Sequence, residues 1–143
     1  MVGVIIAGHG NFASGIESVI KLIVGEQENI RIVDFLEQHS TEDLKRNILE
    51  NINELNCNSY LIFTDIPGGS PFKASVEVSM DNENIEVISG TNVPMIMEIL
   101  FDRDNEEVEK LKQRAIETGK KQILSFELKE SKKEKEIKIE DGI

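Results

Sequence analysis

The chain has 143 residues, of which 39% are hydrophobic, and this is enough for one compact domain with a hydrophobic core. Its formal net charge of −11 argues against nucleic acid and anionic membranes as partners, because both would repel it. The single cysteine, Cys57, excludes an intramolecular disulfide, and no cluster of histidines or cysteines predicts a metal site.

Short apolar runs alternate with amphipathic stretches, a pattern typical of βαβ units around a parallel sheet. Residues 2–7 are almost wholly apolar, as expected of a strand buried on both faces. Apolar residues then recur at helical spacing as far as Gly25, a natural helix stop. Residues 30–35 predict a second strand, and Ser40 with Asp43 predicts a capping box that opens the second helix.

The middle of the chain continues this alternation. Residues 60–64 predict the third strand. Ser70 as N-cap and Pro71 at the first helical position predict a helix that continues over 72–80. Residues 85–89 predict the fourth strand, so the chain has three strand-to-helix units before its final third.

The final third predicts two helices and one further strand. Asn92 and Pro94 open a helix that the acidic stretch 102–107 interrupts, and a second helix then runs to Gly119. Residues 122–128 alternate apolar and polar side chains, as in an antiparallel edge strand that is half-buried.

We therefore predict an α/β domain over residues 1–128, with a doubly wound, mainly parallel sheet in the strand order 2-1-3-4 and the antiparallel strand at its edge. Residues 129–143 are dense in Lys and Glu and predict a charged C-terminal tail.

Two reactive side chains follow strands that are neighbours in this order. His9 follows the first strand and Asp65 follows the third. Ligands of open α/β sheets bind at the carboxyl ends of the strands, where the strand order reverses, so we expect these two residues to meet there. A carboxylate bonded to one ring nitrogen would leave the other nitrogen free to act as a nucleophile.

The surrounding residues predict a phosphate site that uses backbone donors. Gly10 beside His9 leaves room for a ligand, while Gly68, Gly69 and Ser70 precede a helix N-terminus, where free N–H groups favour an anion. No Lys or Arg lies in either loop. His39 precedes a predicted helix cap, and we place it on the surface at the opposite end of the sheet.

Several other readings of these loops fail or carry less weight. A lone histidine in a turn is more often structural than catalytic, and only the joint pattern of His9, Asp65 and the glycine-rich turn favours chemistry. The spacing of the glycines matches neither a dinucleotide fingerprint nor a P-loop. A receiver domain would need an acidic pair after the first strand, and a histidine phosphatase would need an arginine where Gly8 stands.

Four segments together resemble the enzyme IIA component of mannose-family sugar phosphotransferase systems. The resemblance runs from Met1 to about Phe126, and its most specific part is GGSPF in register with an N-terminal histidine. The segments are VIIAGHG at 4–10, GEQEN at 25–29, DIPGGSPF at 65–72 and GTNVPM at 90–95.

The resemblance implies that His9 is phosphorylated on Nε2 and that Asp65 bonds its other ring nitrogen. The donor would be the phosphocarrier HPr, and the acceptor a separate IIB subunit that serves a membrane IIC/IID pair. Such proteins are homodimers that exchange an antiparallel strand, and they need no metal or cofactor.

Neither a membrane span nor a secretory signal is evident, so we expect a cytoplasmic protein. Two alternatives to the transport role are a phosphoryl-carrier subunit of a dihydroxyacetone kinase and a non-catalytic regulatory module of the same fold. Nothing in the sequence identifies the sugar.

Overall fold

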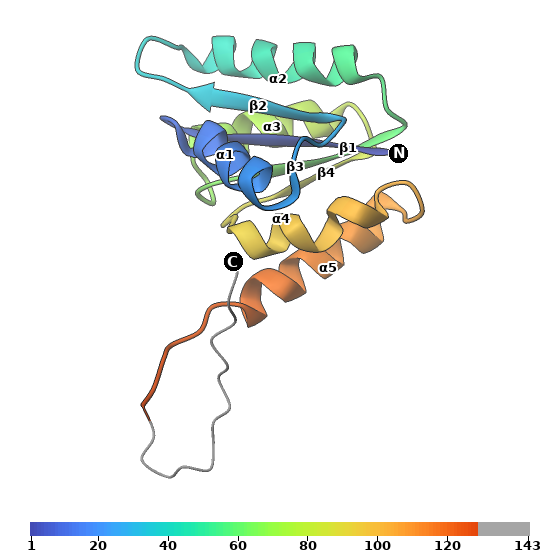
Figure 1. Ribbon diagram of the computed structural model, residues 1–143. Helices are drawn as coiled ribbons and strands as arrows, with labels where there is room; N and C mark the ends of the chain where they lie inside the picture. Colours follow the sequence, from blue (N-terminus) through green and yellow to red (C-terminus); the bar gives the residue numbers. More distant parts are fainter. Residues whose placement is uncertain (129–143) are drawn as a thin grey trace.

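A computed structural model describes residues 1–128 of the chain, and it confirms a doubly wound α/β domain (Figure 1). Four parallel strands form one sheet in the order β2-β1-β3-β4, as predicted. The strands are β1 (Val2–His9), β2 (Ile30–Phe35), β3 (Ser59–Thr64) and β4 (Ile85–Ile88). The helices are α1 (Phe12–Val24), α2 (Thr41–Leu55), α3 (Ser70–Met80), α4 (Val93–Ile99) and α5 (Val108–Lys121), with a 3-10 turn at Leu100–Asp102.

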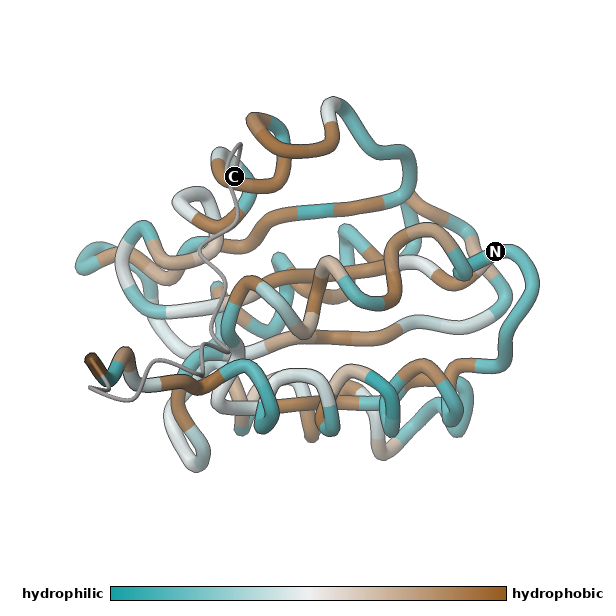
Figure 2. Tube along the Cα trace, turned by 60° about the horizontal axis from the view of Figure 1, so that its bottom comes forward, coloured by the Kyte–Doolittle hydropathy of each residue, from teal (hydrophilic) through white to brown (hydrophobic). Residues whose placement is uncertain are grey.

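Helices cover both faces of the sheet, which explains why the central strands are apolar throughout. Val4 and Ile6 of β1 face α1, α4 and α5, whereas Ile5 and Ala7 face α2 and α3. All four side chains are fully buried. Figure 2 shows the result as hydrophobic segments along the strands, with hydrophilic segments in the outer connections.

The start of α2 follows the sequence prediction closely. The Ser40 hydroxyl accepts a hydrogen bond from the Asp43 backbone N–H at 3.0 Å, and the Asp43 carboxylate accepts one from the Ser40 N–H at 2.9 Å. Both halves of the capping box are therefore present. Three apolar side chains of this helix are buried against the sheet: Leu44, Ile48 and Ile52.

The observed boundaries correct the prediction at two other helices, α3 and α5. Ser70 is not the N-cap of α3: Gly69 holds that position, with extended backbone, and Ser70 is the first helical residue. Helix α5 does not stop at Gly119 but continues to Lys121. Gly119 is tolerated inside the helix because the Met95 side chain packs where a larger residue would stand.

The predicted strand at 122–128 is not formed within the single chain. Residues 123–128 have no regular secondary structure and pair with no strand among the described residues. This segment leads away from the body of the domain after α5 (Figure 1). Four of its large apolar side chains are more than half exposed: Ile123, Leu124, Phe126 and Leu128. The sheet edges at β2 and β4 carry no further strand among residues 1–128, so the segment lies apart from both.

Candidate functional site

His9 and Asp65 meet at the carboxyl ends of the two central strands, as predicted. His9 is the last residue of β1, and Asp65 directly follows β3. The His9 ring atom Nδ1 lies 2.9 Å from Asp65 Oδ2, and the His9 backbone N–H donates to the same oxygen at 2.8 Å. The Ile66 N–H donates to the other carboxylate oxygen, also at 2.8 Å. Three donors therefore converge on one carboxylate.

Asp65 is ionised in this setting. Burial raises the pKa of its carboxyl, but the hydrogen bonds from the His9 backbone N–H, the His9 ring and the Ile66 N–H together bring the pKa below its usual value. An ionised carboxylate only accepts hydrogen bonds, so the proton of the neutral imidazole resides on Nδ1. The Asp65 side chain is 10% exposed and the His9 side chain 44%. Nε2 therefore keeps its lone pair on a ring that reaches solvent.

Two further residues bound the imidazole. A Cβ atom on Gly69 would lie 3.0 Å from His9 Cε1, so only glycine lets the loop after β3 approach the ring without displacing it. On another side, the Phe35 ring packs edge-on, with ring centroids 5.9 Å apart and an interplanar angle of 63°. No sequence motif marks Phe35 as part of the site, although it ends a strand at the same edge of the sheet.

The loop after β4 clamps the end of β3 and so positions Asp65. The Gly90 N–H donates to the Asp65 carbonyl at 3.1 Å. The Thr91 backbone N–H and hydroxyl both donate to the Thr64 carbonyl, at 3.2 and 2.6 Å. Gly90 and Thr91 lie in the GTNVPM segment that carries part of the family resemblance, but no motif there indicates that they hold the end of β3. The position of Gly90 and Thr91 after β4, next to the end of β3, was the one sequence feature that could have predicted this contact.

Helices α1 and α3 both begin near His9, but only the N-terminus of α1 already binds a carboxylate side chain. At α1, the Ser14 N–H donates to the Asp34 carboxylate of β2 at 3.0 Å. At α3, the first turn contains no acidic residue, and its opening N–H groups have no intrahelical partner. The backbone of Gly68 before it is left-handed, with a φ of 81°. Helix α3 therefore offers the better place for a phosphate.

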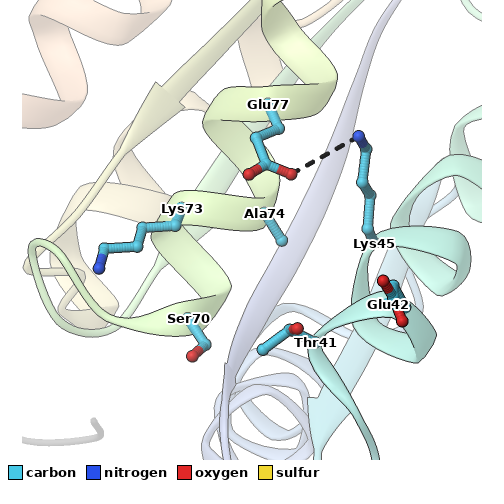
Figure 3. Close-up of a pocket in the computed structure, with 7 residues that line it drawn as sticks. All are labelled: Thr41, Glu42, Lys45, Ser70, Lys73, Ala74 and Glu77. Atoms are coloured by element: carbon cyan, nitrogen blue, oxygen red, sulfur yellow. Dashed lines mark ion pairs between the residues drawn. The ribbon is translucent and has the colours of Figure 1, made fainter.

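A pocket of about 300 Å³ opens beside Ser70, between α2 and α3 (Figure 3). Lys45 of α2 forms an ion pair with Glu77 of α3 across it, at 3.5 Å. The pocket thus brings the cations Lys45 and Lys73 near the glycine-rich turn before α3, although the loops that contain His9 and Gly69 hold no Lys or Arg. Its lining is mixed in charge: Thr41, Glu42, Lys45, Ser70, Lys73, Ala74 and Glu77.

His39 does not lie at the opposite end of the sheet, and this prediction was wrong. It follows β2, which ends beside His9 in the register of the sheet, so His39 is on the same edge as the site. The error came from its position before a helix, because in a parallel sheet the loop that leads into a helix leaves the carboxyl end of a strand. Within residues 1–128, no group of three or more candidate ligand side chains could hold a metal ion. None of the helices in this part of the chain could cross a membrane.

Fold and site together define a class of protein: a doubly wound α/β domain with an exposed, carboxylate-bonded histidine at the switch point of the sheet. The family model described as "EIIA-man: PTS system fructose IIA component" matches residues 3–116. The chain therefore belongs to the mannose-type enzyme IIA family of sugar phosphotransferase systems.

Individual relatives agree with this assignment. The mannose-specific EIIAB component of Escherichia coli K12 is 32% identical over 130 residues, which are 90% of this chain but 40% of that protein. The chain thus spans less than half of the length of this relative. The sorbose-specific EIIA component of Lacticaseibacillus casei is 29% identical over 76% of this chain and 78% of its own. The crystal structure of an EIIA component from Streptococcus agalactiae has a TM-score of 0.82 at 32% identity, covering 87% of this chain and 97% of its own.

Proposed function

We propose that this protein is a phosphoryl carrier of a sugar phosphotransferase system, and that it accepts the phosphoryl group from HPr on His9 and passes it to a IIB subunit. The observation that carries the proposal is the 2.9 Å contact between His9 Nδ1 and Asp65 at the switch point of the sheet. The relatives named for mannose and sorbose transport support it. Their different sugars leave the substrate of this system open.

In the proposed reaction, the Nε2 lone pair of His9 attacks the phosphorus of phosphohistidine on HPr. The new P–N bond forms while the donor's P–N bond breaks, and the electrons of that bond leave with the donor imidazole, whose other ring nitrogen carries a proton so that the ring departs neutral. The proton on His9 Nδ1 stays in place and leaves the product ring cationic. The buried Asp65 carboxylate stabilises this charge. Transfer to IIB is the same step in reverse, with a new acceptor.

The phosphoryl oxygens would lie against the residues predicted from the sequence: Gly10, Gly68, Gly69 and Ser70. The Gly10 and Gly69 N–H groups already donate to the Phe35 and Ile66 carbonyls, at 2.8 and 3.0 Å, so these two glycines would supply room for the group and not donors. Ser70 begins α3, where the first N–H groups have no intrahelical partner and the helix dipole favours negative charge. The Ser70 hydroxyl is a further donor. Asp34 keeps a phosphoryl group away from α1, because it already accepts from that helix and would repel a second anion.

The proposed partners follow from this chemistry. HPr and IIB would dock in turn over the His9 loop and the loop before α3, where Ile66 offers a half-exposed apolar contact. The IIC/IID pair in the membrane would be reached only through IIB, so the carrier would work in the cytoplasm. The exposed apolar segment at 123–128 supports a homodimer in which this segment pairs with the partner's sheet.

Labelling of the purified protein tests the proposal directly. The protein is incubated with phosphoenolpyruvate, enzyme I and HPr, and we expect about one acid-labile, base-stable phosphoryl group per chain on His9. The chain has two histidines, so His9→Ala leaves His39 as an internal control for unspecific labelling. Full labelling of His9→Ala, or none of the wild type, would overturn the proposal. Adding IIB or a dihydroxyacetone kinase as acceptor then separates the transport role from the kinase role.

A further inference from the structure

Asp65 alone does not fix the orientation of the His9 ring. Its hydrogen bond holds Nδ1, but the terminal torsion of a histidine side chain is broad, and the ring can swing about that one contact. Gly69 limits the swing near Cε1. The aim of Nε2 therefore depends on what packs against the remaining side of the ring.

Phe35 supplies that contact. Its ring lies at the distance and angle of an edge-to-face aromatic pair with His9. It is half-buried, and it packs against the apolar core between the sheet and helices α2 and α3. A side chain anchored in the core can hold a neighbouring ring in one orientation, whereas a freely exposed ring cannot.

Hydrogen bonds fix the backbone at Phe35 and at the residue that follows it. Its carbonyl accepts a hydrogen bond from the Gly10 N–H at 2.8 Å, directly after His9. The next residue, Leu36, donates its N–H to the His39 ring atom Nδ1 at 3.0 Å, and the His39 N–H donates back to the Leu36 carbonyl at 3.0 Å. His39 thereby closes a tight turn that fixes where β2 ends.

We propose that Phe35 is a positioning residue that aims His9 Nε2 at the incoming phosphorus, and that the His39 side chain holds Phe35 in place by closing the turn after β2. The inference rests on the proposed function, because it concerns the rate of phosphoryl transfer. It also assigns His39 a structural role at the edge of the sheet where His9 lies, which the sequence alone did not indicate.

Substitutions at Phe35 test the aromatic contact. Phe35→Leu keeps an apolar side chain in the core but removes the ring, whereas Phe35→Tyr keeps the ring edge. We expect Phe35→Leu to lower the saturating rate of transfer from HPr about threefold to tenfold, the range of one aromatic pair. The HPr concentration at half-maximal rate should change less than about twofold, because docking is intact. Phe35→Tyr should stay near the wild-type rate.

The NMR spectrum of His9 separates positioning from general destabilisation. In Phe35→Leu, the ring nitrogens should still report a proton on Nδ1, because the bond to Asp65 remains. The ring-proton resonances should shift and broaden as the ring gains freedom. A wild-type transfer rate, or a slower rate with an unaltered His9 spectrum, would overturn the inference.

A second pair of variants tests the turn and does not depend on core packing. His39→Ala removes the acceptor for the Leu36 N–H, while the side-chain oxygen of His39→Asn can replace it. We expect a rate about twofold to threefold lower for His39→Ala and a rate near wild type for His39→Asn. Equal transfer rates for the two variants would refute the role of His39. This pair of variants still tests the turn after β2 if Phe35→Leu does not fold.

The controls keep the two proposals distinguishable. If the wild-type protein is not labelled on His9 at all, the proposed function fails. If the wild type is labelled normally and the variants match it, the carrier function stands and only the positioning role is wrong.

Discussion

Among single residues, the site depends most on Asp65, because its one carboxylate accepts hydrogen bonds from three N–H groups. Asp65 receives three N–H groups on two oxygens, and one of those oxygens takes both the backbone and the ring of His9. This arrangement sets the tautomer of the ring and ties it to the end of β1. An uncharged replacement of the same shape cannot reproduce it.

Asp65→Asn should therefore slow phosphoryl transfer by at least about tenfold. An amide has one oxygen, so its NH₂ group must face either the N–H groups of His9 or that of Ile66. Transfer from phospho-HPr by rapid quench measures the effect, and a cooperative thermal transition confirms that the variant is folded. A wild-type rate would show that Asp65 does not orient His9.

Gly69→Ala should also slow transfer, because the new methyl group would lie 3.0 Å from His9 Cε1 and push the ring from its position. We expect a loss of about tenfold or less, since the ring can partly yield. Gly15→Ala is the matched control: no other group lies within 4 Å of its added Cβ, and alanine favours the helix there. Equal rates in the two variants would contradict the tight fit at Gly69.

At the scale of elements, the helix N-termini decide where negative charge can reside. Helix α2 is closed by its own capping box, and α1 is closed by Asp34 from the neighbouring strand. Helix α3 has no side-chain cap and no acid in its first turn. A phosphoryl group on His9 would thus find one open helix start near it, which is the basis for assigning it to α3.

The capping box of α2 should make stability depend on pH at the acid end. Hydrogen bonds from the Ser40 backbone and from Arg46 lower the pKa of Asp43 from 3.8 to about 2. Its stabilising effect is therefore fully present above pH 3.8 and is lost as the pH falls through about 2. We expect the stability difference between wild type and Asp43→Asn to shrink over that range.

Urea unfolding at a series of pH values measures this difference. Ser40→Ala should lower the free energy of unfolding by about 1 kcal/mol, because the Asp43 N–H loses its acceptor. Glu50→Gln, on the exposed side of the same helix, is the control for removing one negative charge. If its pH dependence matches that of Asp43→Asn, the capping role is refuted.

In the whole molecule, the last described segment, residues 123–128, differs from the rest because its large apolar side chains are exposed. The sheet leaves β2 and β4 as edges, each with a row of unpaired backbone groups. Residues 123–128 expose four large apolar side chains that no described element covers. Exchange of this segment between two chains would cover the apolar side chains and pair an open edge, because each segment could join an edge of the other chain's sheet.

A chain that ends at Lys121 should consequently sediment as a monomer and lose stability, while one that ends at Leu128 should remain a dimer. The shorter chain keeps the complete helix α5, so the comparison isolates the segment 122–128. Analytical ultracentrifugation at micromolar concentration measures both. A full-length protein that sediments as a monomer would contradict the proposed exchange.

The four parallel strands, the five helices, the sheet order and the pairing of His9 with Asp65 could all be predicted from the sequence, whereas the strand expected at 122–128 is not formed among the described residues. Apolar periodicity, the capping box and the glycine-rich turn are signals within a few residues, and the rule for ligands of parallel sheets then brought His9 and Asp65 together. The groups that surround this pair became apparent only in the folded chain. The contact of Phe35 with His9 and the clamp from Thr91 on Thr64 join residues far apart in the chain, so no local pattern encodes them. The turn that His39 closes is local, but it lies beside His9 only because of the register of β2 against β1.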